Sequence, residues 1–217
     1  MDHGNRFFGD NEERRGYHHG RLKDALVDAA RRLVTERGLA GFTLADAAKL
    51  VGVTSAAPYR HFSDRNALVE EMARRGFEQF GSKLIKAWDG GQPNSRTALA
   101  RMSDAYLGFA REEPGLYSVM FGNIQTLAAP EPGTAATKAL ETLRTAARVI
   151  LEESGVAASD GRELAFELWS FSHGVAILAL AGHLDPAFEG GDPATILRRG
   201  SAALVDASIK RSQRAQR

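Results

Sequence analysis

Residues 43–66 constrain the fold of this chain more than any other segment, because they read as two short helices joined by a tight turn. Thr43 begins the first helix as an N-cap, and Asp46 follows three residues later, as in a capping box with Asp in place of Glu. Gly52 supplies the backbone freedom that a sharp turn needs, and Val53 fills the angle between the helices. The pattern predicts a helix-turn-helix, which places its second helix in the DNA major groove.

Thr54 is expected to cap this second helix, and the helix would present Ser55, Ala56, Tyr59 and Arg60 outward. Side chains at such positions meet either phosphates, which position a protein on DNA, or base edges, which specify the sequence. Arg60 has the geometry to bind guanine with two hydrogen bonds. The alternatives are that Arg60 contacts a phosphate and that Tyr59 is mainly a packing residue.

The segment resembles the TetR family of bacterial one-component regulators. The resemblance rests on Thr43, Ala47, Ala48, Gly52, Val53, Thr54, Tyr59, Arg60, His61, Phe62, Arg65 and Leu68. Family members usually have Ile at position 47, Ala at 51 and Lys at 65, so these departures keep the residue class. Pro58 is less usual, since proline within a helix removes a donor.

One subgroup of the family is similar to this chain in the lead-in 16–20 and the run 57–62. Its C-terminal domain is marked by Trp, His and Gly, which correspond here to Trp169, His173 and Gly174. The resemblance implies a helical C-terminal domain that binds a ligand and forms the dimer.

DNA contacts are expected from the helix-turn-helix and from the helices beside it. Thr43 offers a hydroxyl and free amides to a phosphate. The resemblance assigns phosphate contacts to Tyr59 and His61, while Ala56 and Pro58 suit thymine methyl groups. The complete predicted set is Arg21, Thr43, Thr54, Ser55, Ala56, Pro58, Tyr59, Arg60, His61 and Arg65.

Composition narrows the function classes. The chain has 217 residues, a formal net charge of +1 and no cysteine, which excludes disulfides, thiol nucleophiles and Cys-based metal sites. No run reaches the about 20 apolar residues of a membrane span, and no signal-peptide pattern is present. We expect a cytoplasmic protein without cofactor or membrane partner.

Helical periodicity runs through the rest of the chain, without strand-like alternation. We predict an all-α fold with a flexible N-terminal arm (1–17), a helix-turn-helix domain (18–66) and a helical effector-binding and dimerisation domain (67–217). Ser63 is expected to cap a long helix that ends near 89–91, and Pro130–Gly133 to break the chain. Further helices are expected over 95–112, 135–153 and 160–183, and from Asp192–Pro193 onward.

Residues 160–183 carry two apolar stripes, and a helix of this kind must be buried on more than one side. The last helix adds small residues that allow close approach. We expect both helices to form a four-helix bundle with a second subunit, the alternative being a core within one chain. The predicted interface residues are Leu164, Leu168, Phe171, Val175, Leu178, Ile196, Gly200, Ala203, Leu204 and Ala207.

Met and aromatic residues gather in the central helices, and such side chains line apolar pockets with a few polar groups. Tyr106, Trp169 and His173 each bring a polar group that burial must satisfy. The predicted effector pocket comprises Met102, Tyr106, Phe109, Tyr117, Met120, Phe121, Phe166, Trp169, Ser170 and His173. The alternative for each is that it belongs to the core.

The sequence therefore predicts a regulator, most simply a repressor that binds an inverted-repeat operator as a homodimer and is released by a small apolar or aromatic effector. An activator of the same fold and a non-specific structural DNA-binding protein are the alternatives. An enzyme is disfavoured, because the chain has no metalloprotease, nucleophile-elbow or phosphate-loop motif.

Overall fold

The computed structural model describes residues 10–122, 129–156, 161–184, 187 and 191–215, with side chains from residue 21 onward. Most of the described residues are helical, and none of them lies in a strand. The elements are α1 (Asp10–Arg37), α2 (Leu44–Val51), η1 (Ala57–Arg60), α3 (Arg65–Trp88), η2 (Asp89–Gly91), α4 (Ser95–Glu112), α5 (Pro114–Phe121), α7 (Pro130–Glu153), α8 (Gly161–Leu180) and α9 (Pro193–Ala215). The all-α prediction is confirmed.

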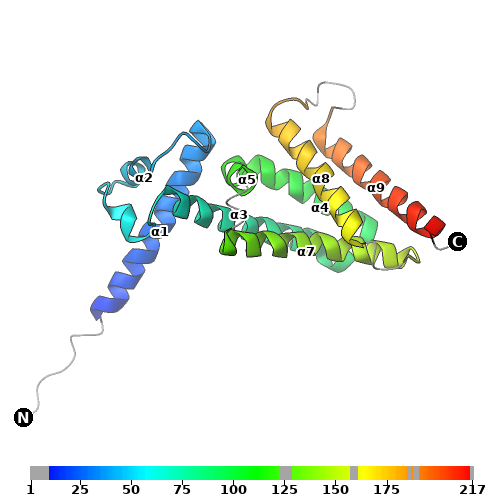
Figure 1. Cartoon of the computed structure of the whole chain (residues 1–217), viewed down its shortest axis with the longest axis horizontal. Coiled ribbons are helices and arrows are strands. Elements are labelled where there is room, and N and C mark those ends of the chain that lie inside the picture. Colours follow the sequence, from blue (N-terminus) through cyan, green and yellow to red (C-terminus); the bar gives the residue numbers. More distant parts are fainter. Residues whose placement is uncertain (1–9, 123–128, 157–160, 185–186, 188–190, 216–217) are drawn as a thin grey trace, which may run out of the picture.

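The N-terminal domain packs α1, α2, η1 and the start of α3 around a small core (Figure 1). Leu26, Ala30, Phe42, Ala47 and Phe62 are buried in it. Leu26 and Ala30 lie on the apolar face of α1 and Ala47 on that of α2, while Phe42 precedes α2 and Phe62 follows η1.

Helix α3 is the structural axis of the chain. It leaves the N-terminal domain and runs into the C-terminal bundle, where it packs against α4, α5 and α7 (Figure 1). Leu68 and Met72 are buried near its start, and Phe77, Phe80 and Leu84 farther along. Because one rigid helix serves both domains, a tilt of α3 in the bundle moves the N-terminal domain as well.

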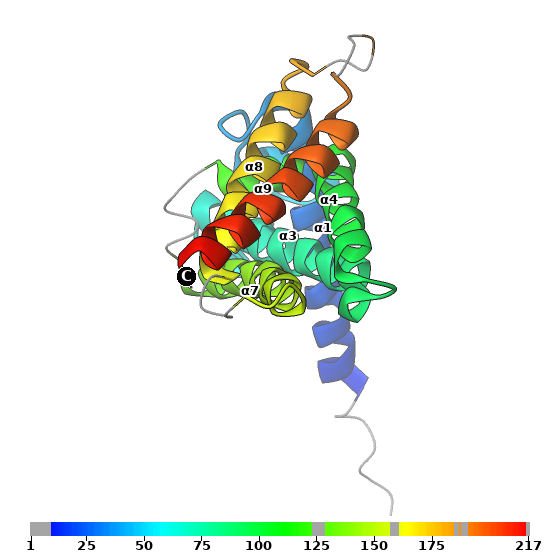
Figure 2. The same cartoon turned by 90° about the vertical axis from the view of Figure 1, so that its right-hand side faces the viewer.

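Helices α8 and α9 lie side by side and antiparallel at the edge of the bundle (Figures 1 and 2). By length and composition α8 meets the minimum for a membrane span, with a mean hydropathy of 1.2 over its best window. Its Leu164, Leu168 and Val175 are buried within the bundle. Packing therefore accounts for much of the apolar character of this helix.

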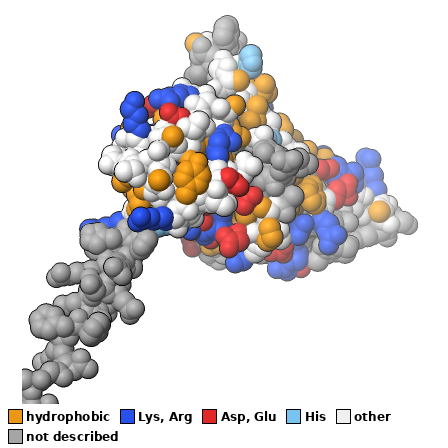
Figure 3. Space-filling view, turned by 60° about the vertical axis from the view of Figure 1, so that its left-hand side comes forward, with side chains coloured by type: hydrophobic (Ala, Val, Ile, Leu, Met, Phe, Trp, Pro, Cys, Tyr) orange, Lys and Arg blue, Asp and Glu red, His pale blue; other side chains and the backbone are white. Residues whose placement is uncertain are grey.

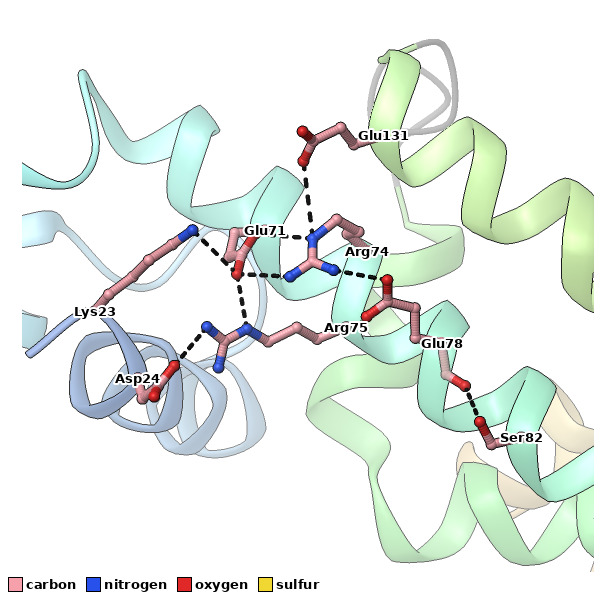
Figure 4. Close-up of polar contacts among 8 residues, drawn as sticks. All are labelled: Lys23, Asp24, Glu71, Arg74, Arg75, Glu78, Ser82 and Glu131. Atoms are coloured by element: carbon pink, nitrogen blue, oxygen red, sulfur yellow. Dashed lines mark hydrogen bonds and ion pairs between the residues drawn. The ribbon is translucent and has the colours of Figure 1, made fainter. Parts of the chain in front are cut away.

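A cluster of charged side chains joins α1 to α3 (Figure 4). The Glu71 carboxylate is only 8% exposed and accepts hydrogen bonds from Arg74 (2.9 Å) and Arg75 (2.8 Å). Lys23 of α1 lies 3.3 Å from the same carboxylate, and Arg75 also donates to Asp24 of α1 at 2.7 Å. The cluster thus holds the N-terminal domain at a defined angle on α3.

The outer members of this cluster are exposed. Arg74 donates to Glu78 at 2.7 Å and lies 3.8 Å from Glu131 at the start of α7. Burial by itself raises the pKa of Glu71, but the hydrogen bonds from Arg74 and Arg75 outweigh it and lower this pKa to about 2. Glu71 is therefore ionised at neutral pH.

Several helix boundaries differ from the predictions. Helix α1 begins at Asp10, so residues 10–17 are helical rather than part of a flexible arm, and residues 1–9 lie outside the described part. Asp64, not Ser63, caps α3, since its side chain accepts from the Ala67 amide at 2.9 Å. Pro130–Gly133 forms the first turn of α7 instead of a break, because proline is well tolerated there.

Candidate nucleic-acid interface and ligand cavity

The first half of the helix-turn-helix is built as predicted. The Thr43 hydroxyl accepts from the Asp46 amide at 3.1 Å, and the Asp46 carboxylate accepts from the Thr43 amide at 2.9 Å, which completes the capping box. The Thr43 hydroxyl also donates to the Asp46 carboxylate at 2.6 Å, and this bond, together with the one from the Thr43 amide, lowers the pKa of the Asp46 carboxyl. Gly52 ends α2 with φ of 82°, a left-handed conformation that glycine adopts without strain.

The second half is shorter than predicted. Thr54 does not cap an α-helix, because Ala57–Arg60 forms a single 3-10 turn whose N-cap residue is Ala56, without a side-chain cap. The Ala57 amide bonds to the Thr54 carbonyl at 3.0 Å, which is the three-residue spacing of a 3-10 turn. Pro58 contributes no amide hydrogen, which favours this tight turn over a longer α-helix.

Most of the predicted DNA contacts on this turn are exposed. Tyr59 is 61% exposed, which excludes the alternative that it is mainly a packing residue. Thr54, Ser55, Ala56 and Arg60 are also exposed, as base reading requires. These residues lie on one short turn, so their spacing along a DNA groove is fixed by η1.

Pro58 and Arg65 are corrections to the predicted interface. Pro58 is buried, and its ring cannot meet a thymine methyl group in this structure. Arg65 is half-buried and donates to the carbonyls of Phe42 (3.0 Å) and Leu39, with its guanidinium 4.6 Å from the centre of the Phe42 ring. Arg65 therefore ties the loop before α2 to the start of α3 instead of reaching for a phosphate.

The remaining predicted contacts lie around this turn. Thr43 and Arg21 are exposed, and His61 is half-buried. Figure 3 shows that the Lys and Arg side chains of this domain stand apart among uncharged groups, without a continuous basic patch on the described surface of that face.

A cavity of about 240 Å³ lies between α3, α4, α5, α7 and α8. Its lining residues are Phe77, Phe80, Leu84, Tyr106, Phe121, Gly133, Ala136, Thr137, Ala139, Leu140, Leu143 and Trp169. The Phe80 and Tyr106 rings meet edge to face, with centroids 4.9 Å apart. Small residues on α7 leave the space that these rings surround.

A chain of polar side chains starts at the cavity wall. The Tyr117 hydroxyl donates to the Tyr106 hydroxyl at 3.3 Å and lies 2.8 Å from Nδ1 of His173. Burial raises the pKa of both tyrosines and lowers the pKa of His173. All three side chains are therefore neutral at neutral pH and hold their protons for hydrogen bonding.

Three residues of the predicted pocket, Tyr106, Phe121 and Trp169, line this cavity. Tyr117 and His173 line a separate open groove of about 440 Å³ between α1, α5 and α8. Other members are corrections. Phe109 and Met120 are fully buried in the core, Met102 borders a small void of about 20 Å³, and Phe166 and Ser170 are exposed.

Prediction from sequence missed most of the cavity wall on α3 and α7. Phe77, Phe80 and Leu84 follow the helical spacing of α3, and that spacing marks a buried face without distinguishing core from cavity. It also missed the Glu71 cluster. The spacing of Glu71 to Arg74 and Arg75, at three and four residues, is the signal that would have found it.

The predicted dimer interface is wrong for the inner stripe of α8. Leu164, Leu168 and Val175 are buried within the chain, and Phe171 packs against Gly200 of α9, where an added Cβ would lie 2.2 Å from the ring. Helix α8 has two apolar sides, and the tertiary structure turns the side with Leu164, Leu168 and Val175 toward the bundle. These residues are therefore unable to face a second subunit.

Four large apolar residues of α8 are exposed, on two sides of the helix. Phe166, Ile177, Leu178 and Leu180 are between 39% and 46% exposed. Leu178 follows the stripe of Val175, whereas Ile177 and Leu180 line the groove with α1 and α5. On α9, Ala203 is exposed, whereas Ile196, Gly200, Leu204 and Ala207 are half-buried. Leu178 of α8 and Ala203 of α9 are thus apolar residues of the predicted interface that the described part of one chain leaves uncovered.

Comparison with known proteins assigns the family. The model for "Bacterial regulatory proteins, tetR family" matches residues 26–72, and that for "Tetracyclin repressor-like, C-terminal domain" matches residues 99–204. The chain belongs to the TetR family. The chain is a DNA-binding regulator of this family, in agreement with the exposed helix-turn-helix.

Curated relatives match the chain in part. The nucleoid occlusion factor SlmA of Haemophilus influenzae is 32% identical over 106 residues, or 48% of this chain and 47% of that protein. The uncharacterized HTH-type transcriptional regulator YobS of Bacillus subtilis is 29% identical over 45% of this chain and 50% of that protein. The chain spans about half the length of these relatives.

Solved structures resemble the chain over most of its length. A protein of unknown function from Rhodococcus sp. RHA1 has a TM-score of 0.75 and 27% identity, over 88% of this chain and 97% of that one. The regulator PfmR of Thermus thermophilus has a TM-score of 0.64 and 19% identity, over 83% and 97%. The latter likeness concerns the fold alone.

Proposed function

We propose that this TetR-family regulator is a ligand-responsive repressor that binds an inverted-repeat operator as a homodimer in the cytoplasm and is released by a small apolar or aromatic effector. The observation that carries the proposal is the dual role of α3. Phe77, Phe80 and Leu84 of α3 line the cavity, while the same helix is joined to α1 through Glu71. A ligand that favours one tilt of α3 changes operator affinity by its differential binding energy.

The proposed domains are a DNA-binding domain (18–66), preceded by the first turns of α1, and an effector and dimerisation domain (67–217). Trp169 lines the cavity and His173 bonds to Tyr117, which supports membership of the Trp-His-Gly subgroup.

The homodimer is supported by the exposed apolar face of α8. One η1 turn spans too few base pairs for useful specificity, whereas two turns related by a two-fold axis read an inverted repeat. Leu178, on the same side as Val175, is 44% exposed, and Ala203 of α9 is exposed as well. Substitution of Leu178 by Glu should give a monomer in analytical ultracentrifugation and abolish binding to the full operator.

The central experiment is selection of bound fragments from a random DNA pool at a stated salt concentration, because phosphate contacts make affinity salt-dependent. The proposal requires recovery of an inverted repeat. Recovery of fragments without symmetry would contradict both the dimer and the operator. Titration of the effector against free and operator-bound protein then tests release, and equal affinity in the two states would exclude it.

Arg60 provides a test of base reading. Arg60→Ala should cost about 1–3 kcal/mol against the preferred base and relax specificity at one position of each half-site. Arg111→Ala, which removes the same charge from an exposed site in the C-terminal domain, is the matched control. A uniform loss of affinity for all sequences would instead make Arg60 a phosphate contact.

Two alternatives to a repressor are an activator of the same fold and a nucleoid occlusion factor. An activator of the same fold would bind a similar operator, and a transcription assay with the operator placed upstream or downstream of the promoter separates it from a repressor. A role in nucleoid occlusion is supported by the partial similarity to SlmA. It would require many binding sites along the chromosome and no effector-dependent release.

A further inference from the structure

The cavity carries information about the ligand it accepts, and an inference about that ligand rests on the proposed function. Aromatic rings make up much of its wall, including Phe77, Phe80, Phe121 and Trp169. Flat apolar walls of this kind favour planar ligands that stack or meet the rings edge to face. The polar groups of the described wall are few, namely Tyr106, Thr137 and the indole of Trp169.

No charged side chain lines the cavity among the residues that the structure describes. Transfer of an unpaired carboxylate into such a site costs several kcal/mol. The start of α7 does not offset this cost, although helix N-termini commonly bind anions. Pro130 and Pro132 have no amide hydrogen, and the Gly133 amide already bonds to the Ala129 carbonyl at 2.9 Å. Glu131 in the same turn adds a negative charge.

The aromatic wall would attract a cation, but the attraction is weaker than the cost of removing the cation from water. A cation over an aromatic face gains about 2 kcal/mol when desolvated, against a desolvation cost of several kcal/mol. A counter-charge would have to make up the difference. Glu131 is the acid nearest in sequence to the lining residue Gly133, and its side chain is 78% exposed and lies 3.8 Å from Arg74. The balance favours an uncharged ligand.

Tyr106 is placed to hold the polar end of the ligand. Its hydroxyl accepts from the Tyr117 hydroxyl at 3.3 Å, and the Tyr117 oxygen in turn lies 2.8 Å from Nδ1 of His173. A hydroxyl group that accepts one hydrogen bond keeps its own proton for another acceptor. The residue is buried, so a partner for this proton adds binding energy.

The cavity also limits ligand size. Its volume of about 240 Å³ exceeds the roughly 150 Å³ of an engineered cavity that binds benzene. It is below the about 300–1,000 Å³ typical of sites for drug-sized molecules. One or two fused rings with a small substituent fit between these limits.

We propose that the effector is an uncharged molecule of one or two fused aromatic rings, whose hydrogen-bond acceptor is bound by the Tyr106 hydroxyl. A long acyl chain, a carboxylate and an ammonium ion are excluded by size or charge. Tyr106 is then the residue that separates an effector from a hydrocarbon of the same shape.

A matched series of naphthalenes tests the proposal by isothermal titration calorimetry on the full chain without DNA. The probes are 2-acetylnaphthalene, 2-ethylnaphthalene, 2-naphthoate and 2-naphthylmethylammonium. We expect the ketone to bind about tenfold more tightly than the hydrocarbon, which is about 1.4 kcal/mol and typical of one buried hydrogen bond. Both ions should bind at least about tenfold more weakly than the hydrocarbon.

Two variants locate the polar contact. Tyr106→Phe keeps the ring and should reduce the affinity for the ketone to that for the hydrocarbon. Thr137→Val removes the other hydroxyl of the cavity wall and should leave the preference for the ketone unchanged. Circular dichroism and thermal unfolding of each variant establish that it is folded before titration.

Every other outcome overturns the proposal: tighter binding of either ion, a ketone preference that survives Tyr106→Phe, or no binding by any probe. Fluorescence anisotropy with operator DNA tests the ligand class and the release mechanism separately. If the ketone binds through Tyr106 and operator affinity stays the same, the ligand class holds and the release mechanism fails. If a charged ligand releases the operator, the release mechanism holds and the ligand class fails.

Discussion

Replacement of Glu71 by Gln tests how strongly the charge cluster fixes the DNA-binding domain on α3. Glu71 faces three cations and is 8% exposed. The lowering of its pKa from 4.5 to about 2 corresponds to an upper limit of about 3 kcal/mol. Lys23, Arg74 and Arg75 are between 24% and 40% exposed, so solvent screening reduces this figure. We expect Glu71→Gln to lower the free energy of unfolding by about 2 kcal/mol at pH 7.

The pH dependence has a defined sign. A carboxyl group whose pKa is lowered by folding stabilises the native state fully above its unfolded pKa, here near 4.5. This contribution is lost as the pH falls from about 4.5 toward about 2. The difference in unfolding free energy between wild type and Glu71→Gln should therefore be constant from pH 7 to pH 5 and shrink steadily below pH 4.5.

Urea denaturation followed by circular dichroism at pH 7, 5, 4 and 3 measures this difference, with protein concentration held constant because a dimer gains stability with concentration. Glu78→Gln is the matched control, since Glu78 pairs with the same Arg74 but is 55% exposed. Its effect should be about 0.5 kcal/mol or less. Equal losses in both variants, or a Glu71 difference that is as large at pH 3 as at pH 7, would refute the reasoning.

Two further substitutions probe contacts between helices. In thermal unfolding, Gly115→Ala should destabilise the protein by about 1–3 kcal/mol, because the new Cβ would lie 2.7 Å from the Arg31 carbonyl oxygen and force α5 away from α1. Gly108→Ala is the control: its Cβ meets only a side-chain oxygen at 3.7 Å, so it should be neutral or stabilising in the same assay. Arg65→Lys should cost about 1–2 kcal/mol in urea denaturation, since lysine cannot reproduce the planar stack on Phe42 and both carbonyl bonds, and an unchanged midpoint would assign Arg65 back to DNA contact.

Local signals in the sequence were reliable where short-range geometry decides the structure. The capping box at Thr43, the left-handed turn at Gly52 and the helix from Ser95 to Glu112 all formed as predicted. Each depends on residues within one or two turns of the chain. The short recognition turn was missed because the effect of Pro58 on a marginal helix is a balance of small local terms.

The binding cavity and the uncovered face show the limit of this reasoning. The periodicity of α8 marks two apolar sides, and both are compatible with burial inside the chain or against a partner. Only the packing of α9, with Gly200 against Phe171, decides that Leu164 and Leu168 face inward and Ile177 outward.

The sequence by itself determined an all-helical chain with a helix-turn-helix, because capping, glycine turns and helical periodicity are properties of neighbouring residues. Tertiary structure alone decided the rest. Whether Phe80 packs in a core or lines a cavity depends on the small residues of α7, about sixty positions away in the chain. Likewise, Glu71 joins α3 to α1 only because Lys23, on the other helix, lies 3.3 Å from its carboxylate. Contacts between distant segments arise from the packing of whole helices, and no local pattern encodes them.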